Sequence, residues 1–131
     1  MTEGAIPSEL KYTKSHEWVR ADGDVLTVGI TDHAQSELTD IVYVDLTAKS
    51  AAVAAGAVVL VLESVKTVAD VYAPVAGEVT ERNPQLKEHP DYVNRYPYAE
   101  GWMFRIRPSA PVGEGVLLSA DEYRAFLASG G

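Results

Sequence analysis

The chain has no cysteine among its 131 residues. This absence excludes disulfide bonds, thiolate metal sites and a cysteine nucleophile. Basic residues are also few, since 11 Lys and Arg stand against 19 Asp and Glu, which gives a formal net charge of −8. Such a surface repels phosphate backbones, so we expect no nucleic-acid partner, and it favours encounters with basic protein surfaces.

Long apolar runs are missing as well. The longest, from Ala51 to Leu62, is interrupted by Gly56 and is too short to span a bilayer. The first ten residues have neither the basic and apolar regions of a secretory signal nor the arginine-rich pattern of a transit peptide. We therefore expect no membrane association and a bacterial-type cytoplasmic location.

The length of the chain predicts a single domain over residues 1–131, because about this many residues make one ordinary domain. Hydrophobic residues make up 47% of the chain, which is enough for one core, and no linker divides it. Residues 1–10 are expected to form a loose N-terminal extension. The acidic composition favours a monomer.

The chain pattern predicts mainly β-structure. An Asp-Gly pair at Asp22 marks a hairpin turn between strands around residues 16–20 and 25–30. Residues 58–62 are apolar at every position, which is typical of a strand covered on both faces. Further strands are expected at residues 41–47, 67–72, 78–82 and 102–108. This regular spacing of short strands indicates a sandwich and not a parallel α/β array.

Helices are expected to be few and short. Asp32 and Ser119 are each followed three residues later by Gln or Glu, a pattern that predicts a capping box and a helix start. The second pair opens a predicted C-terminal helix over residues 120–128. Short helical pieces are expected between residues 85 and 94.

The residue pattern gives no sign of a catalytic or metal site. The histidines His16, His33 and His89 are not spaced as a local metal pair, and solvated or structural roles are expected for them. Ser64 and Lys66 match no serine-lysine catalytic spacing, and no Gly-rich phosphate loop is present. We therefore expect a carrier or binding module and not an enzyme.

Lys66 is the one cation in the largely apolar stretch from Val61 to Val79. The flanking strands place it at the tip of a hairpin, where an enzyme that acylates an amine can reach it. From the turn alone, a lysine that only contributes to solubility is the commoner case.

The segments around Lys66 resemble the lipoyl-attachment region of the H proteins of the glycine cleavage system. The family's E-S-V-K core matches residues 63–66, and its D-V-Y-A-P and G-E-V elements follow at Asp70 and Gly77. Three further blocks resemble the family in the same order, namely "YTKSHEWV", "VGITDHAQSELTDIVYVDL" and "EGWMFRIRP". The resemblance covers about Tyr12 to Pro108, and "LLSADEYRAFL" is similar to the family's tail helix.

This resemblance implies a lipoyl/biotinyl-domain-like β-sandwich of two small antiparallel sheets, with short flanking helices and a C-terminal helix. It implies lipoate attached as a lipoyl amide to Lys66, in a turn where Glu63, Ser64 and Val65 are recognised by the lipoyl-attaching enzyme. Glu17 is the candidate cleft residue that pairs with the amine of the loaded arm. An ordinary exposed strand glutamate is the alternative.

The implied role is that of a non-catalytic carrier. A pyridoxal-phosphate-dependent glycine decarboxylase would load the arm with an aminomethyl group. A tetrahydrofolate-dependent aminomethyltransferase would unload it, and a dihydrolipoyl dehydrogenase with FAD and NAD would reoxidise the dithiol. The contribution of the carrier would be a high effective concentration of the tethered group.

Three alternatives remain. Biotin carriers share the fold, but their lysine usually lies between two methionines, whereas Val65 and Thr67 flank Lys66. An H-like protein that relays lipoyl groups to other enzymes, or serves another dithiol pathway, would have the same turn. The third is an unmodified β-sandwich.

The chain departs from the family pattern at four positions. They are His33, Thr39, Tyr96 and Ala99. Thr39 and Ala99 stand where glycine is usual, so these two put loop detail and partner docking in question and leave the carrier role intact.

Overall fold

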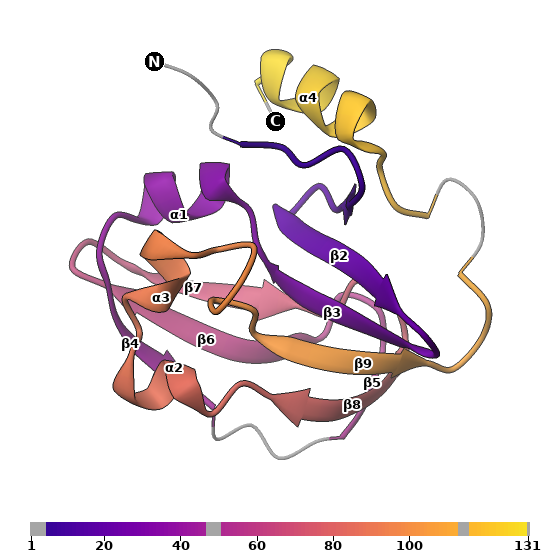
Figure 1. The fold of residues 1–131 in the computed structure, drawn as a ribbon, viewed down its shortest axis with the longest axis horizontal. Helices are drawn as coiled ribbons and strands as arrows, with labels where there is room; N and C mark the ends of the chain where they lie inside the picture. Colours follow the sequence, from indigo (N-terminus) through magenta and orange to yellow (C-terminus); the bar gives the residue numbers. More distant parts are fainter. Residues whose placement is uncertain (1–4, 47–50, 113–115, 131) are drawn as a thin grey trace.

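The computed structural model describes residues 5–46, 51–112 and 116–130. In these ranges, nine strands form two antiparallel sheets (Figure 1). One sheet has six strands in the order β1-β2-β3-β9-β8-β5, and the other has three in the order β4-β6-β7. The expected two-sheet β-fold is confirmed, although one sheet has twice as many strands as the other.

The elements follow one another along the chain as short segments. The strands are β1 (Lys11–Tyr12), β2 (Glu17–Asp22), β3 (Val25–Ile30), β4 (Ile41–Asp45), β5 (Ala52–Val53), β6 (Val58–Ser64), β7 (Val68–Tyr72), β8 (Gly77–Arg82) and β9 (Phe104–Pro108). The helices are α1 (Asp32–Leu38), α2 (Gln85–Glu88), α3 (Tyr92–Arg95) and α4 (Ala120–Ala128).

The hairpin of β2 and β3 forms where the Asp-Gly signal predicts it. Gly23 lies in the turn with a φ of 67°, a backbone conformation that glycine adopts without steric cost. Further along the hairpin, Trp18 is paired with Gly29. A Cβ at Gly29 would lie 2.7 Å from the indole nitrogen of Trp18, so glycine is required here for the indole to pack against the backbone.

The connection between β4 and β6 differs from the sequence prediction. Ala52 and Val53 form β5, which pairs with β8, and no local pattern announces this strand because the pairing joins distant segments. Residues 47–50 lie outside the described part of the chain. Strand β6 is covered only in part, since Val59, Leu60 and Leu62 are buried, whereas Val58 is 45% exposed and Val61 is half-buried.

Both predicted helix starts are present, with one difference in detail. Ser119 and Glu122 form the expected capping box of α4. At α1 the N-cap is Thr31, whose hydroxyl accepts a hydrogen bond from the Ala34 amide, and not Asp32. Asp32 instead accepts a hydrogen bond from the Gln35 side chain.

Two hydrophobic clusters stabilise the fold. The main cluster combines buried side chains from both sheets and from α2 and α3, among them Val28, Leu60, Leu86, Phe104 and Ile106. The second lies where α4 packs against β1 (Figure 1), and its buried members are Leu10, Tyr12, Trp18, Ala120 and Tyr123. Through the second cluster, the C-terminal helix is attached to the large sheet.

The N-terminal segment is more ordered than the expected loose extension. Leu10 is buried, and Ile6 packs against the second cluster. The Tyr12 hydroxyl donates to the Pro7 carbonyl oxygen, and the Ala5 amide donates to the Asp32 carboxylate. Residues 5–10 therefore form part of the packed structure, while residues 1–4 lie outside the described part.

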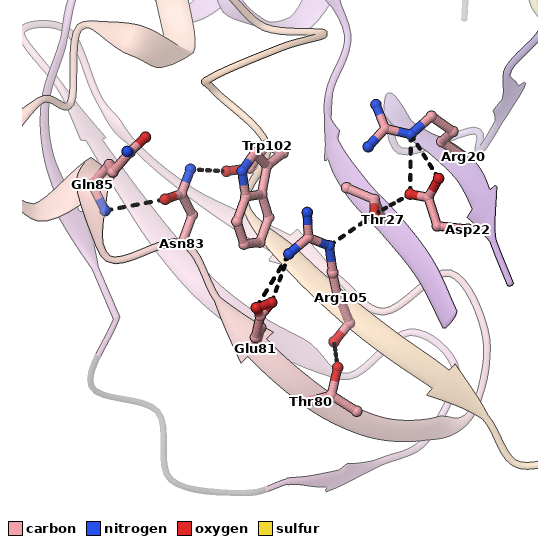
Figure 2. A network of polar contacts seen from close by, with 9 residues as sticks. All are labelled: Arg20, Asp22, Thr27, Thr80, Glu81, Asn83, Gln85, Trp102 and Arg105. Atoms are coloured by element: carbon pink, nitrogen blue, oxygen red, sulfur yellow. Dashed lines mark hydrogen bonds and ion pairs between the residues drawn. The ribbon is translucent and has the colours of Figure 1, made fainter. Parts of the chain in front are cut away.

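A polar network lies across the six-stranded sheet (Figure 2). Arg105 donates two hydrogen bonds to the Glu81 carboxylate and one to the Thr27 hydroxyl, and Thr27 donates to Asp22. The Arg105 guanidinium also lies 4.0 Å from the centroid of the Trp102 ring. These arginine contacts lie within the protein, and the network holds neighbouring strands of the sheet together.

Candidate functional site

The turn between β6 and β7 is built around the Ser64 hydroxyl. Its oxygen accepts hydrogen bonds from the backbone amides of Lys66, at 3.0 Å, and Thr67, at 2.9 Å. The Ser64 amide in turn donates to the Thr67 carbonyl oxygen at 2.8 Å. A serine at this position therefore fixes the turn, because a short hydroxyl side chain satisfies amides that point away from the sheet.

The same turn exposes its two central side chains. Val65 is 68% exposed, and Lys66 is exposed as well. The Val65 amide donates to the Asp40 carbonyl oxygen at 3.0 Å, which ties the tip to the segment after α1. The structure thus presents Lys66 at a hairpin tip, as the sequence predicts, and it adds a hydrogen bond between this tip and the rest of the protein.

Glu63 lies on the exposed face of β6. It is paired with Tyr43 of β4 on one side and with Val68 of β7 on the other. All three side chains are exposed. The Glu63 side chain is therefore available at the surface close to Lys66. Among the described residues, it has no side-chain hydrogen bond that would compete with a partner.

Glu17, the other candidate residue, is buried and is not an ordinary exposed strand glutamate. It is 1% exposed, and its Oε1 accepts from the hydroxyls of Thr13, at 2.5 Å, and Ser15, at 2.6 Å. Its Oε2 accepts from the Tyr72 amide of β7 at 3.2 Å. Burial raises the pKa of Glu17, although these hydrogen bonds act in the opposite direction.

A cleft of about 320 Å³ lies between α1, β7 and the segment that precedes β2; we call it the arm cleft. Its polar lining residues are Ser15, His16, Glu17, His33, Glu37 and Asp70. Lys66 lies beside it, since the Lys66 Nζ donates to the carbonyl oxygen of Glu37, which lines the cleft. The structure therefore places the Lys66 side chain in contact with a residue of the same cleft that Glu17 lines.

A second cavity of about 580 Å³ lies on the other side of Glu17. Tyr12, Lys14, Tyr72 and Pro74 contribute to its lining, and Ser15 and Glu17 line both cavities. Glu17 and its hydrogen-bond partner Ser15 therefore lie at the boundary between the two cavities.

Sequence reasoning missed several of the cleft residues. His16 and His33, for which solvated or structural roles are expected, both line the cleft, and their rings lie 4.9 Å apart, centroid to centroid. Asp70 lies within the D-V-Y-A-P element and Ser15 next to H-E-W. Their place in these two blocks was the only signal that pointed to them.

The departure at Thr39 has a visible structural cost. Thr39 ends α1 with a φ of 62° and a ψ of −155°, a backbone region that only glycine adopts freely. This backbone conformation explains why glycine is usual at this position. Its carbonyl oxygen accepts a hydrogen bond from the Asn94 side chain, which attaches this strained residue to α3.

Two other properties bear on the kind of site. Among the described residues, no group of three or more His, Asp or Glu side chains is arranged to hold a metal ion. None of the helices in the described ranges has the length and hydrophobicity needed to cross a membrane.

Comparisons with known proteins agree with this geometry. A family model described as "Glycine cleavage H-protein" matches residues 10–130. A glycine cleavage system H protein from Edwardsiella ictaluri is 54% identical over 123 residues, which cover 93% of this chain and 96% of the relative. Another from Rubrobacter xylanophilus is 53% identical over 122 residues, covering 93% and 94%. The crystal structure of a glycine cleavage system H protein from Mycobacterium marinum is 38% identical, with a TM-score of 0.83, and the match covers 94% of this chain and 99% of that one.

Proposed function

The chain belongs to the glycine cleavage H-protein family, and on this premise we propose that Lys66 is the residue to which lipoate is attached. The chain is a lipoyl carrier of the glycine cleavage system. The observation that supports Lys66 is its position, exposed at the tip of the hairpin turn that Ser64 fixes. Attachment forms an amide on Nζ and removes one positive charge from the tip.

The residues before Lys66 have separate tasks in this proposal. The exposed side chains of Glu63 and Val65 are the ones that the lipoyl-attaching enzyme would contact, whereas Ser64 keeps the turn in shape. Glu63→Gln should slow lipoylation and leave the fold intact. Glu78→Gln, which removes an exposed carboxylate elsewhere, is the matched control. Equal lipoylation rates in the two variants would contradict a role of Glu63.

The arm cleft is the proposed location of the loaded arm. An aminomethyl group on the opened lipoyl is a cation near neutral pH, and a surface cleft shields it from water. Glu17 is the proposed partner of this amine, because its buried carboxylate lines the cleft and Ser15 and Thr13 hold it in place. Binding of a cation would also offset the cost of keeping this carboxylate ionised in a buried position.

The partners of the carrier are proposed from its membership of the system. They are the pyridoxal-phosphate-dependent glycine decarboxylase, the tetrahydrofolate-dependent aminomethyltransferase, the dihydrolipoyl dehydrogenase and the lipoyl-attaching enzyme. In this proposal these enzymes perform the chemistry, and the carrier raises the effective concentration of the tethered group at each of them. The cytoplasmic location remains a prediction.

The first experiment is an intact-mass measurement after expression in a lipoylation-competent host supplied with lipoate. We expect a mass increase of one lipoyl group in the wild type and in Lys87→Ala, which changes another exposed lysine, and none in Lys66→Ala. A folded wild-type protein without the increase would overturn the assignment. Activity of the lipoylated protein with the glycine decarboxylase then separates the carrier from a relay that only donates lipoyl groups to other enzymes.

The role of Glu17 is tested with the loaded protein. Release of the one-carbon unit should be faster from Glu17→Gln than from the wild type, because the amide cannot pair with a cation. Glu63→Gln is the control, since Glu63 lies outside the lining of the arm cleft. Unchanged release from Glu17→Gln would refute the pairing.

A further inference from the structure

The hydroxyl of Tyr123 connects the C-terminal helix α4 to two segments that line the arm cleft. It lies 2.8 Å from Nδ1 of His16, which lines the cleft, and 2.8 Å from the hydroxyl of Thr31. Thr31 is the N-cap of α1, a helix that also contributes residues to the cleft lining. Tyr123 itself is fully buried, so this connection is shielded from water.

The donors and acceptors in these hydrogen bonds follow from the partners available to the Thr31 hydroxyl. Its oxygen already accepts from the Ala34 amide, and a buried hydroxyl hydrogen needs an acceptor. Among the described contacts of Thr31, the Tyr123 oxygen is the acceptor within reach. Tyr123 therefore donates its own hydrogen to Nδ1 of His16. Nδ1 is then unprotonated, and neutral His16 carries its proton on Nε2.

The backbone of His16 is held as firmly as its ring. His16 has a φ of 72°, an unusual conformation for a residue with a side chain, and such strain persists only where neighbours fix it. The His16 amide donates to the Thr13 carbonyl oxygen, and the His16 carbonyl oxygen accepts from the Thr31 amide. The ring also contacts Phe126 of α4, with 5.9 Å between centroids.

From these contacts we propose that Tyr123 is a positioning residue, which holds His16 as the neutral Nε2–H tautomer in the wall of the arm cleft. The inference rests on the proposed function, since it concerns the amine that the cleft receives. A neutral imidazole next to Glu17 does not repel a cation, whereas a protonated one would compete with it for the carboxylate. The C-terminal helix thereby acts on the arm cleft through His16, although none of its residues lines the cleft.

Several titratable groups surround His16. They are Glu17, the next residue along the chain, His33 and Glu37 on α1, Asp70 on β7 and Tyr123 on α4. Burial lowers the pKa of His16, the nearby His33 lowers it further, and Glu37 acts in the opposite direction. Neutral His16 is therefore the form present at pH 7, and protonation as the pH falls would place a positive charge in the wall of the cleft.

The tautomer is tested by nitrogen NMR of the full-length chain, which needs no lipoyl group. We expect the wild-type His16 Nδ1 to show the shift of an unprotonated nitrogen. Tyr123→Phe should favour protonation of His16 about five-fold, which corresponds to one neutral hydrogen bond to the unprotonated ring. Tyr12→Phe is the matched control. The Tyr12 ring stacks on Tyr123, but its hydroxyl donates to the Pro7 carbonyl oxygen and not to His16. A protonated Nδ1, or easier deprotonation in Tyr123→Phe, would overturn the inference.

The effect on the carried group is tested with loaded protein. As the pH falls, one-carbon release should accelerate at a higher pH in Tyr123→Phe than in the wild type and Tyr12→Phe. Identical pH profiles in the three proteins would overturn the positioning role even if the NMR result holds. Failure of the proposed function would instead be seen as absence of the lipoyl mass, on which the NMR measurement does not depend.

Discussion

The side-chain nitrogen of Lys66 lies 3.1 Å from the carbonyl oxygen of Glu37, so the hairpin tip contacts the last turn of α1. An amide formed on this nitrogen keeps one N–H, and the contact can persist as a neutral hydrogen bond after the charge is lost. The helix that forms one wall of the arm cleft therefore also contacts the proposed attachment point. The turn, the end of α1 and the arm cleft are therefore connected through one helix.

Ser64→Ala should destabilise the hairpin turn. The change removes the acceptor of the Lys66 and Thr67 amides, and loss of such a capping oxygen costs about 1 kcal/mol. Chemical denaturation of the two proteins measures the difference. Ser64→Thr keeps the hydroxyl and is the control, and an equal loss in both variants would show that the hydrogen bonds are not responsible.

Glu17→Gln should change how stability depends on pH. Because burial raises the pKa of Glu17, the folded protein holds this proton at a pH where the unfolded chain has released it. The resulting stabilisation is complete below the pKa of the unfolded chain, about 4.3, and is lost as the pH rises through the higher folded pKa. Relative to the wild type, the Gln variant should therefore gain stability as the pH rises through this window.

Urea denaturation at a series of pH values tests this expectation. Glu63→Gln is the control for loss of one negative charge, since its side chain is exposed. Parallel pH profiles for wild type and Glu17→Gln would mean that the buried carboxylate carries no net penalty.

Thr39→Gly should stabilise the protein by about 1 kcal/mol. Thr39 occupies a backbone region that costs a residue with a side chain about 1–3 kcal/mol, and the greater freedom of glycine in the unfolded chain offsets part of the gain. Thermal denaturation is the measurement. Thr39→Ala keeps the Cβ and should show no such gain, so a comparable rise in both variants would exclude backbone strain as the cause.

Gly29→Ala should destabilise the fold by about 1–3 kcal/mol. The added Cβ would meet the Trp18 indole at 2.7 Å, and the indole is held by its hydrogen bond to the Pro97 carbonyl oxygen. Gly23→Asn is a suitable comparison, because that turn has open space around it and asparagine tolerates a positive φ. Similar stabilities for the two variants would show that Trp18 can move aside.

Features with local causes could be predicted from the sequence. The Asp-Gly turn after Asp22 and the capping box at Ser119 depend on residues within a few positions of each other, and both are present. The hairpin around Lys66 also has a local cause, because Ser64 and Thr67 are hydrogen-bonded to each other within the turn.

Features that join distant segments could not be predicted in this way. Burial of Glu17 depends on Tyr72, 55 positions away, and the contact between His16 and Tyr123 spans 107 positions. Periodicity within one segment carries no information about such pairs. The same holds for β5, which exists because β8 lies beside it.

The backbone hydrogen bond from Val65 to Asp40 affects how a carrier meets its enzymes. A tip that is hydrogen-bonded to the rest of the protein adds little motion of its own. The distance that a tethered group can reach therefore depends on the rotatable bonds of the tether and not on loop motion. The entropy lost when an enzyme captures that group is confined to the same few bonds. Successive enzymes would then meet the group within the same maximum reach of the surface on which they dock.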